Sequence, residues 1–150
     1  MRIYVASSWR NTQQPIVVAA LRAVGHLVYD FRNPGNGNHG FHWSEIDPDW
    51  KQWTPLLYRQ QLSHHLAEEG FRSDMNALES ADVVVAVQPF GRSTALELGW
   101  ACGARKETIL LLENGEPELM VKMCDYICVS LAEVQQILAR LDDKKVTHET

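Results

Sequence analysis

The sequence is poor in cysteine, in basic residues and in long apolar runs. Its three cysteines leave one thiol unpaired in any disulfide scheme, and no signal peptide is recognisable, so we expect reduced thiols and a cytoplasmic protein. The longest apolar runs, such as 83–87 and 109–112, are far shorter than the ~20 residues of a membrane-spanning helix. These features predict a soluble protein with no membrane partner.

Acidic residues outnumber basic ones, 19 to 14, and the formal net charge is -5. Proteins that bind nucleic acid polymers neutralise the phosphates with clustered lysines and arginines. The charge balance therefore argues against a nucleic acid polymer as a partner. It leaves open a single nucleotide, which needs only a few basic contacts.

Residues that commonly bind metals are present but badly spaced. The cysteines do not follow the pattern of a zinc site. The neighbouring His64 and His65 diverge by about 100 degrees on a helix, and no cysteine or acid completes a ligand set with them or with His39 and His42. We therefore expect no metal and no cofactor.

The chain alternates between short apolar runs rich in β-branched residues and segments whose apolar residues recur every three or four positions. The predicted strands are 2–6, 26–31, 82–87, 108–112 and 126–129. The predicted helices are 13–24, 54–69, a segment carrying 74–81, 93–101, 117–124 and 130–141. We expect Thr54 and Pro55 to start a helix and Gly70 to end it. Residues 142–150 are expected to form a frayed tail.

Strands that alternate with helices imply a parallel sheet covered on both faces. We therefore predict an α/β fold, flavodoxin-like or Rossmann-like, with a doubly wound five-stranded parallel sheet in three layers, α/β/α, and one domain over residues 1–150. Ligands in such folds bind beyond the carboxyl ends of the strands, where the strand order reverses. The loops 6–11 and 88–93 are therefore favoured as binding loops.

Glu97 is the first candidate for chemistry, because it lies near the start of a helix at the predicted binding edge. Helix amides can keep a carboxylate ionised there, and Leu96 and Trp100 are expected to face the core. Asp74 is a second acid, from the preceding helix. Two carboxylates are the arrangement that glycosidic cleavage uses. The alternative is a solvated helix glutamate, because spacing alone does not bring the two acids together.

The segment 74–87, followed by Glu97-Leu98-Gly99, resembles the nucleoside 2-deoxyribosyltransferase family, including its branch of 2'-deoxynucleoside 5'-monophosphate N-hydrolases. The opening Ile3-Tyr4-Val5-Ala6-Ser7-Ser8-Trp9-Arg10 is also similar to the first strand and loop of that family. The similarity spans roughly residues 2–112.

The resemblance implies a flavodoxin-like sheet and cleavage of the N-glycosidic bond of a nucleoside or nucleotide. It implies that Glu97 is the nucleophile, that Asp74 assists the leaving base and that Tyr4 orients Glu97. The glycosyl-enzyme is then resolved by water or by an acceptor base. The resemblance also implies a homodimer or higher homo-oligomer, whose neighbouring subunit often completes the site.

One turn departs from the family, whose transferases commonly carry an aspartate between the third strand and the nucleophile. Here that turn contains Gly91, Arg92 and Ser93. Arg92 and Ser93 beside a helix start form a plausible phosphate pocket, which favours a nucleotide. The facing loop offers further donors in Ser7, Ser8, Arg10 and Asn11. The alternatives are an ordinary loop and an Arg92 that points to solvent or pairs with Glu45.

The segment 32–53 has three tryptophans and no sustained period. Trp43 is a candidate to stack on the base as part of a lid, and packing of the segment onto the core is the alternative. Two other functions also fit the pattern: a non-catalytic nucleotide-binding or sensor module, in which Glu97 bonds a ribose hydroxyl, and an NAD glycohydrolase.

Overall fold

A computed structural model describes residues 1–148, except for the side chains of Val146 and His148. Its centre is a parallel sheet with the strand order β2-β1-β3-β4-β5. The strands are β1 (Arg2–Ala6), β2 (Leu27–Asp30), β3 (Val83–Val87), β4 (Glu107–Leu111) and β5 (Tyr126–Cys128). This is the flavodoxin-like order, which reverses between β1 and β3. The predicted fold class is confirmed.

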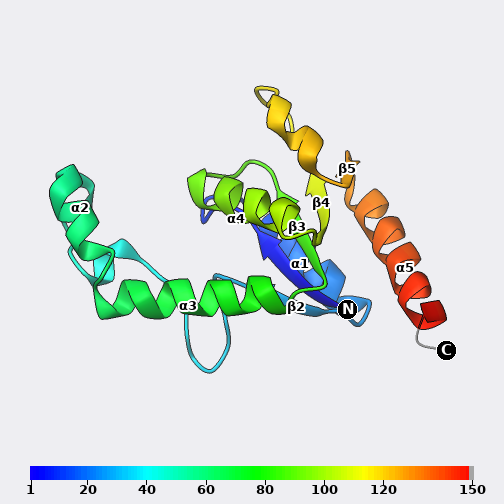
Figure 1. Cartoon of the computed structure of the whole chain (residues 1–150), viewed down its shortest axis with the longest axis horizontal. Coiled ribbons are helices and arrows are strands. Elements are labelled where there is room, and N and C mark those ends of the chain that lie inside the picture. The colour runs from blue at the N-terminus through cyan, green and yellow to red at the C-terminus, as the bar shows by residue number, and fades with distance from the viewer. Residues whose placement is uncertain (149–150) are drawn as a thin grey trace. The chain divides into compact units, whose positions relative to one another are not determined.

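Helices separate the strands along the chain (Figure 1). The α-helices are α1 (Gln14–Ala23), α2 (Pro55–Gln61), α3 (His65–Ser80), α4 (Arg92–Gly103) and α5 (Leu131–His148), and the short 3-10 helices are η1 (Trp43–Glu45), η2 (Trp50–Gln52) and η3 (Leu119–Met123). The helix α5 continues to His148, past its predicted end at 141. Within residues 1–148, no helix has both the length and the apolar character needed to cross a bilayer.

The two faces of the sheet are covered by different helices (Figure 1). Side chains alternate between the faces along each strand. Val5 and Val85 belong to a buried cluster that includes Leu21 of α1 and Leu138 of α5. On the other face, residues of β3 and β4 pack against Leu98 of α4. The sheet therefore lies between two helical layers, as the sequence pattern predicts.

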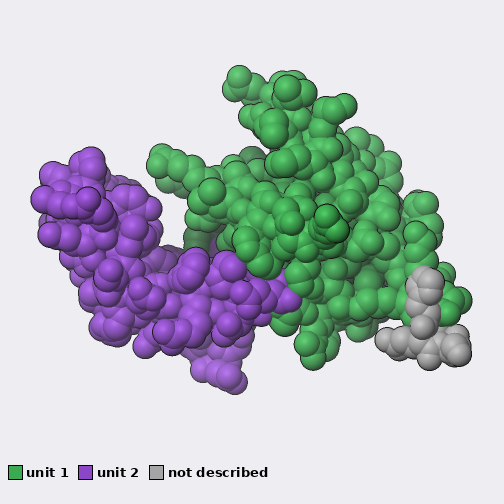
Figure 2. Space-filling view, in the orientation of Figure 1, with its two compact units in different colours: residues 1–30, 80–150 green, residues 31–79 purple. Residues whose placement is uncertain are grey.

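The chain forms two compact units, coloured green and purple in Figure 2. The first consists of residues 1–30 together with 80–150, and it contains the sheet, α1, α4 and α5. The second consists of residues 31–79, with α2 and nearly all of α3. The single domain inferred from the sequence stays a prediction.

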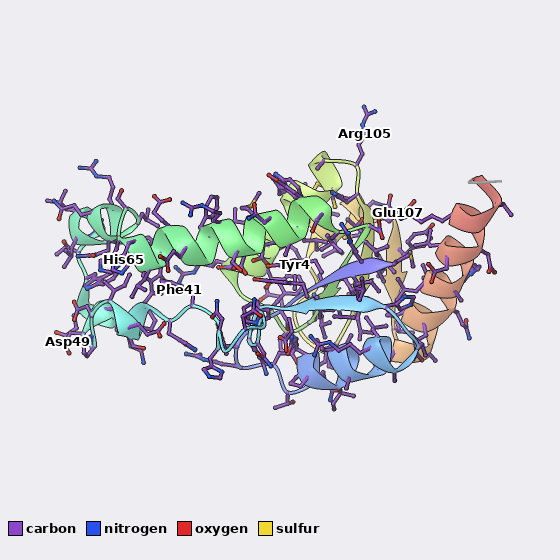
Figure 3. All side chains as sticks on the ribbon, turned by 90° about the horizontal axis from the view of Figure 1, so that it is seen from below. Tyr4, Phe41, Asp49, His65, Arg105 and Glu107 are labelled. Atoms are coloured by element: carbon purple, nitrogen blue, oxygen red, sulfur yellow. The ribbon has the colours of Figure 1, made fainter. Side chains whose placement is uncertain are left out.

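Gly70 does not end a helix, contrary to the prediction. Thr54 does cap α2, because its Oγ1 accepts a hydrogen bond from the amide of Leu57 over 3.2 Å. However, α2 ends at Gln61, and Gly70 lies inside α3. A Cβ atom at Gly70 would lie 2.9 Å from the Cβ of Phe41, a residue that Figure 3 labels. The glycine therefore permits close packing of Phe41 against α3.

Four aromatic residues of the second unit pack against one another. The Trp43 ring makes edge-to-face contacts with Phe41, Trp53 and Tyr58, at centroid distances of 4.7, 5.5 and 5.8 Å. The indole of Trp53 donates a hydrogen bond to Asp47 Oδ2 over 2.6 Å. The segment that looked irregular in sequence thus has a small aromatic core of its own.

Candidate active site

Tyr4 and Glu97 meet on the face of the sheet that α4 covers. Tyr4 is the middle residue of β1 and is 0% exposed. Its hydroxyl donates a hydrogen bond of 3.1 Å to Oε1 of Glu97, which is half-buried on α4. A phenol that donates to a carboxylate fixes the orientation of the carboxylate and stabilises its ionised form.

The surroundings of Glu97 differ from the expectation in two respects. The helix α4 begins at Arg92, so Glu97 is its sixth residue, and the effect of the helix amides fades within the first turn. The Tyr4 hydroxyl, from β1, supplies a hydrogen-bond donor that does not depend on the helix start. Leu96, expected to be buried, is 76% exposed. The helix buries Thr94, Leu98 and Ala101 instead, because that stripe faces the sheet.

The loop after β1 is tied to the end of β3. The Ser7 hydroxyl donates to the carbonyl of Val87 over 2.7 Å. The Asn11 amide donates to the carbonyls of Val87 and Pro89 over 3.0 and 3.2 Å, and its Oδ1 accepts from the amides of Gln13 and Gln14. These bonds engage both amide hydrogens and the oxygen of Asn11. Asn11 thus holds the loop in place.

Ser8 and Arg10 lie further out on the same loop. The backbone amide of Arg10 donates to the Ser8 hydroxyl over 3.2 Å. Ser8 is half-buried and Arg10 is exposed. Of the four donors predicted on this loop, Ser7 and Asn11 attach the loop to the end of β3. Ser8 and Arg10 lie nearer to solvent.

Gly91, Arg92 and Ser93 form the start of α4 but do not share one side of it. Gly91 precedes the helix, and the other two are exposed in its first turn. Ser93 lies four residues before Glu97 and therefore on the same side of the helix. Arg92 is about 140 degrees away from Glu97 around the axis. The structure thus separates two residues that the sequence groups together.

Arg92 lines a cavity of about 470 Å³ beside the turn that leaves β3. The wall opposite is the loop after β4, with Asn114, Glu116 and Glu118. Gln88 connects the two walls, since its side-chain oxygen accepts a hydrogen bond from the amide of Glu113 over 3.2 Å. Arg92 therefore lines the same cavity as Glu116 and Glu118.

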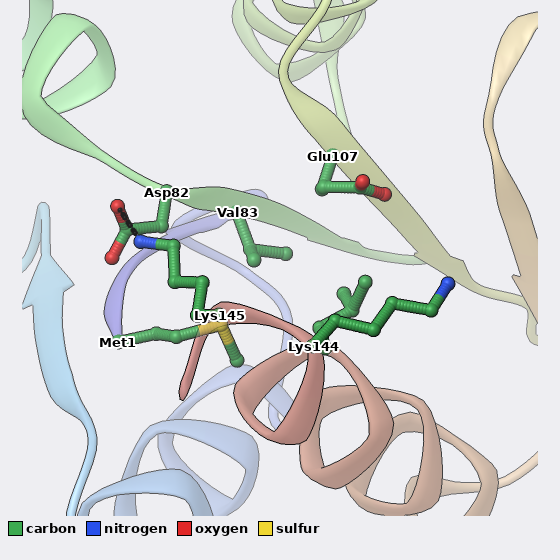
Figure 4. A pocket seen from close by; sticks show the side chains of 7 residues that line it. Met1, Asp82, Val83, Glu107, Lys144 and Lys145 are labelled. Atoms are coloured by element: carbon green, nitrogen blue, oxygen red, sulfur yellow. Dashed lines mark ion pairs between the residues drawn. The ribbon is translucent and has the colours of Figure 1, made fainter. Parts of the chain in front are cut away.

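A second cavity, of about 340 Å³, lies at the amino ends of the strands (Figure 4). Asp82 and Glu107 line it together with Lys144 and Lys145 of α5. Lys145 pairs with Asp82 over 2.6 Å. Burial raises the pKa of Asp82, but the hydrogen bonds from Lys145 and from the Arg2 amide lower it more, and the net pKa is below its ordinary value. The cavity is at the edge of the sheet where α/β folds do not usually bind ligands.

Asp74 and Trp43 belong to the second unit. Asp74 is half-buried in the interior of α3, and Trp43 is the centre of the aromatic cluster described above. The pairing of Asp74 with Glu97 and the stacking of Trp43 on a base stay predictions.

The cysteines and histidines were candidates for metal binding by residue type. Cys128 is buried in the core, and Cys102 and Cys124 pack beside Leu98. Burial, together with the neighbouring Cys102, raises the pKa of Cys124 to about 12, so its thiol is protonated at neutral pH. Among the residues described, no three histidine, cysteine or acidic side chains are grouped to hold a metal ion.

Tyr29 is a residue of this site that the sequence did not single out. Its ring stacks on the ring of Tyr4, with the centroids 5.2 Å apart and the planes inclined by 17°. The only signal in the sequence is a tyrosine in each of the first two strands. That signal is insufficient, because a shift of one residue in register would turn one ring to the other face.

The fold is shared with enzymes of nucleoside chemistry. The 2-deoxyribosyltransferase of the psychrotolerant bacterium Bacillus psychrosaccharolyticus is similar to this chain with a TM-score of 0.63 and 20% identity, over 89% of this chain and 90% of that one. The CMP N-glycosidase BcmB of Clostridium botulinum is similar with a TM-score of 0.52 and 19% identity, over 93% of this chain and 99% of that one. No protein-family model and no curated protein sequence matches the chain. These likenesses confirm the fold that the resemblance implied.

Proposed function

We propose that the chain is an enzyme that cleaves the N-glycosidic bond of a nucleoside or nucleoside 5'-monophosphate through a covalent glycosyl-Glu97 intermediate. The hydrogen bond of 3.1 Å from the buried Tyr4 hydroxyl to Glu97 carries this proposal. An oriented, ionised carboxylate is what attack on an anomeric carbon requires. The fold shared with a 2-deoxyribosyltransferase and a CMP N-glycosidase supports the same class of reaction.

The reaction has two steps at C1' of the sugar. A Glu97 oxygen attacks C1', and the bond from C1' to the base nitrogen breaks with its electron pair moving to the base. The transition state resembles an oxocarbenium ion, and the product is a glycosyl ester of Glu97. In the second step water, or the nitrogen of an acceptor base, attacks C1' and releases the Glu97 carboxylate, while the proton of the attacking water or base passes to the group that protonated the leaving base. Tyr4 binds Oε1 and thereby orients the carboxylate for the attack.

Asp74 assists the departure of the base. The leaving base gains negative charge as its bond to C1' breaks, and a carboxylic acid that donates a proton to it lowers the barrier. The sequence resemblance supplies this assignment, and the half-burial of Asp74 in α3 is compatible with a shielded acid.

The predicted substrate contacts divide into two groups. Ser8, Arg10 and Ser93 supply donors to the sugar or phosphate, while Gly91 leaves the amides at the start of α4 accessible to an anion. Ser7 and Asn11 hold the loop that carries Ser8 and Arg10, and Arg92 lines the neighbouring cavity. Stacking of Trp43 on the base keeps the role inferred from the sequence. The active form is a homodimer or higher homo-oligomer.

A chromatographic screen for released base tests the proposal. The chain is incubated with nucleosides, their 5'-monophosphates and NAD, each with and without an acceptor base. We expect a free base from at least one nucleoside or monophosphate, and a new nucleoside only if the enzyme is a transferase. Release of nicotinamide from NAD alone would support an NAD glycohydrolase. Binding without any release, unaffected by Glu97→Gln, would replace the proposal with a sensor module.

A further inference from the structure

We propose that Tyr29 is a positioning residue for the nucleophile: its ring holds Tyr4 in the orientation from which the Tyr4 hydroxyl reaches Glu97. This inference rests on the proposed function, because Glu97 must be the nucleophile for its orientation to affect turnover. The stack of the two rings and the hydrogen bond at the end of one of them are the observations that carry it.

The register of the sheet produces the stack. In the parallel pairing of β1 with β2, Tyr4 lies directly beside Tyr29. Neighbouring strands are about 4.8 Å apart, and side chains at paired positions point to the same face of the sheet. Two tyrosines in that relation place their rings face to face, and the observed centroid separation is 5.2 Å. A shift of one residue in this register would turn one of the rings to the other face of the sheet.

On the two strands that flank β1, the positions paired with Tyr4 hold Tyr29 and Val84. The side chain of Val84, on β3, is shorter than a phenol ring. A Tyr4 ring without Tyr29 gains room to tilt towards the edge strand. Its hydroxyl is at the far end of the ring, so a small tilt carries it beyond hydrogen-bonding distance of Glu97.

Tyr29 covers the Tyr4 ring on the side of β2, the edge strand of the sheet. Tyr29 is half-buried, whereas Tyr4 is 0% exposed. A ring in this position keeps water away from the Tyr4 hydroxyl, and a hydrogen bond to a carboxylate is stronger where water is excluded. The same side chain thus fixes the geometry of the bond and shields it.

The test compares Tyr29→Leu with Tyr29→Phe. Leucine fills part of the space but cannot stack, and we expect kcat for base release to fall roughly three- to tenfold with KM little changed. Phenylalanine keeps the ring and loses only the hydroxyl, so it should retain kcat within about twofold. The acidic limb of the pH profile of kcat should move to higher pH in Tyr29→Leu, because a less supported carboxylate holds its proton more tightly. Circular dichroism and urea unfolding check that each variant is folded.

A double-mutant cycle with Tyr4→Phe separates positioning from a general structural role. If Tyr29 acts through the Tyr4 hydroxyl, Tyr29→Leu has no further effect on kcat once that hydroxyl is removed. Effects that multiply, or a Tyr29→Phe variant as slow as Tyr29→Leu, would overturn the inference. Where the wild-type chain releases base and Glu97→Gln does not, either of these two outcomes refutes the role of Tyr29 but leaves the proposed function standing. If Glu97→Gln turns over normally, the proposed function fails, and this inference fails with it.

Discussion

The Tyr4 hydroxyl and the Glu97 carboxylate are joined by a hydrogen bond of 3.1 Å although 93 residues separate them in the chain. The bond connects the strand β1 to the helix α4 on the face opposite α1 and α5. The predicted effects on catalysis depend on whether the Glu97 carboxylate is the nucleophile. Separate substitutions test Glu97 and the other residues assigned to the reaction or to the substrate.

Replacement of Glu97 should remove turnover without unfolding the protein. We expect Glu97→Ala and Glu97→Gln each to lower kcat for base release by roughly a thousandfold or more, because no other group replaces the nucleophile. Glu97→Gln keeps an acceptor for the buried Tyr4 hydroxyl, so it should be the more stable of the two in urea unfolding. Activity near that of the wild type in either variant would refute the assignment.

Asp74→Asn should affect chemistry more than binding. An acid that acts while the base departs appears in kcat, and general acid catalysis contributes roughly a hundredfold or more. We therefore expect kcat to fall by about that factor while KM changes little. Steady-state kinetics on the best substrate of the screen measures both constants. A rise in KM alone would make Asp74 a binding residue.

Residues at the start of α4 should determine how strongly the enzyme prefers a nucleoside monophosphate to its nucleoside. The sequence predicts a preference for the monophosphate, carried by Arg92 and Ser93. The helix geometry favours Ser93, because it shares the side of Glu97, and Arg92 faces the cavity with Glu116 and Glu118. We expect Ser93→Ala to lower the ratio of kcat/KM between a monophosphate and its nucleoside by about tenfold.

Arg92→Ala is the matched control. We expect it to change the ratio of kcat/KM between the monophosphate and its nucleoside by less than about threefold. A preference that disappears in Arg92→Ala would mean that the guanidinium turns towards the phosphate. Equal rates on both substrates in the wild-type chain would instead favour a nucleoside transferase.

Gly70→Ala should destabilise the protein even though alanine is the better helix former. The added methyl group would meet the Phe41 side chain at 2.9 Å, and overpacking of this kind costs about 1–3 kcal/mol. The free energy of unfolding from urea titration should fall. Gly99→Ala is the control, because Gly99 lies in α4 with no atom within 4 Å of the new methyl group. That variant should gain about 0.5–1 kcal/mol. A stabilised Gly70→Ala would show that Phe41 moves away freely.

The alternation of strands and helices, and the loops that follow β1 and β3, could be predicted from the amino-acid sequence alone. The strand Val83–Val87 and the helix start at Thr54-Pro55 depend on residues that are adjacent in the chain. They can therefore be predicted without knowledge of the fold. Glu97 and Asp74 are candidates by their residue type and their places in the predicted helices, and the resemblance, whose motifs are likewise contiguous segments, adds Tyr4 and assigns the three roles.

Only the tertiary structure decided which side chains meet. Tyr29 lies on Tyr4 because of the register of β1 with β2, and Leu96 is exposed because α4 turns a different stripe to the sheet. Gly70 lies inside a helix, where the Phe41 side chain approaches the place that a Cβ atom would take. Each outcome depends on a contact between residues far apart in the chain. Helix and strand periodicity constrain which residues share a face, but they do not determine what that face contacts.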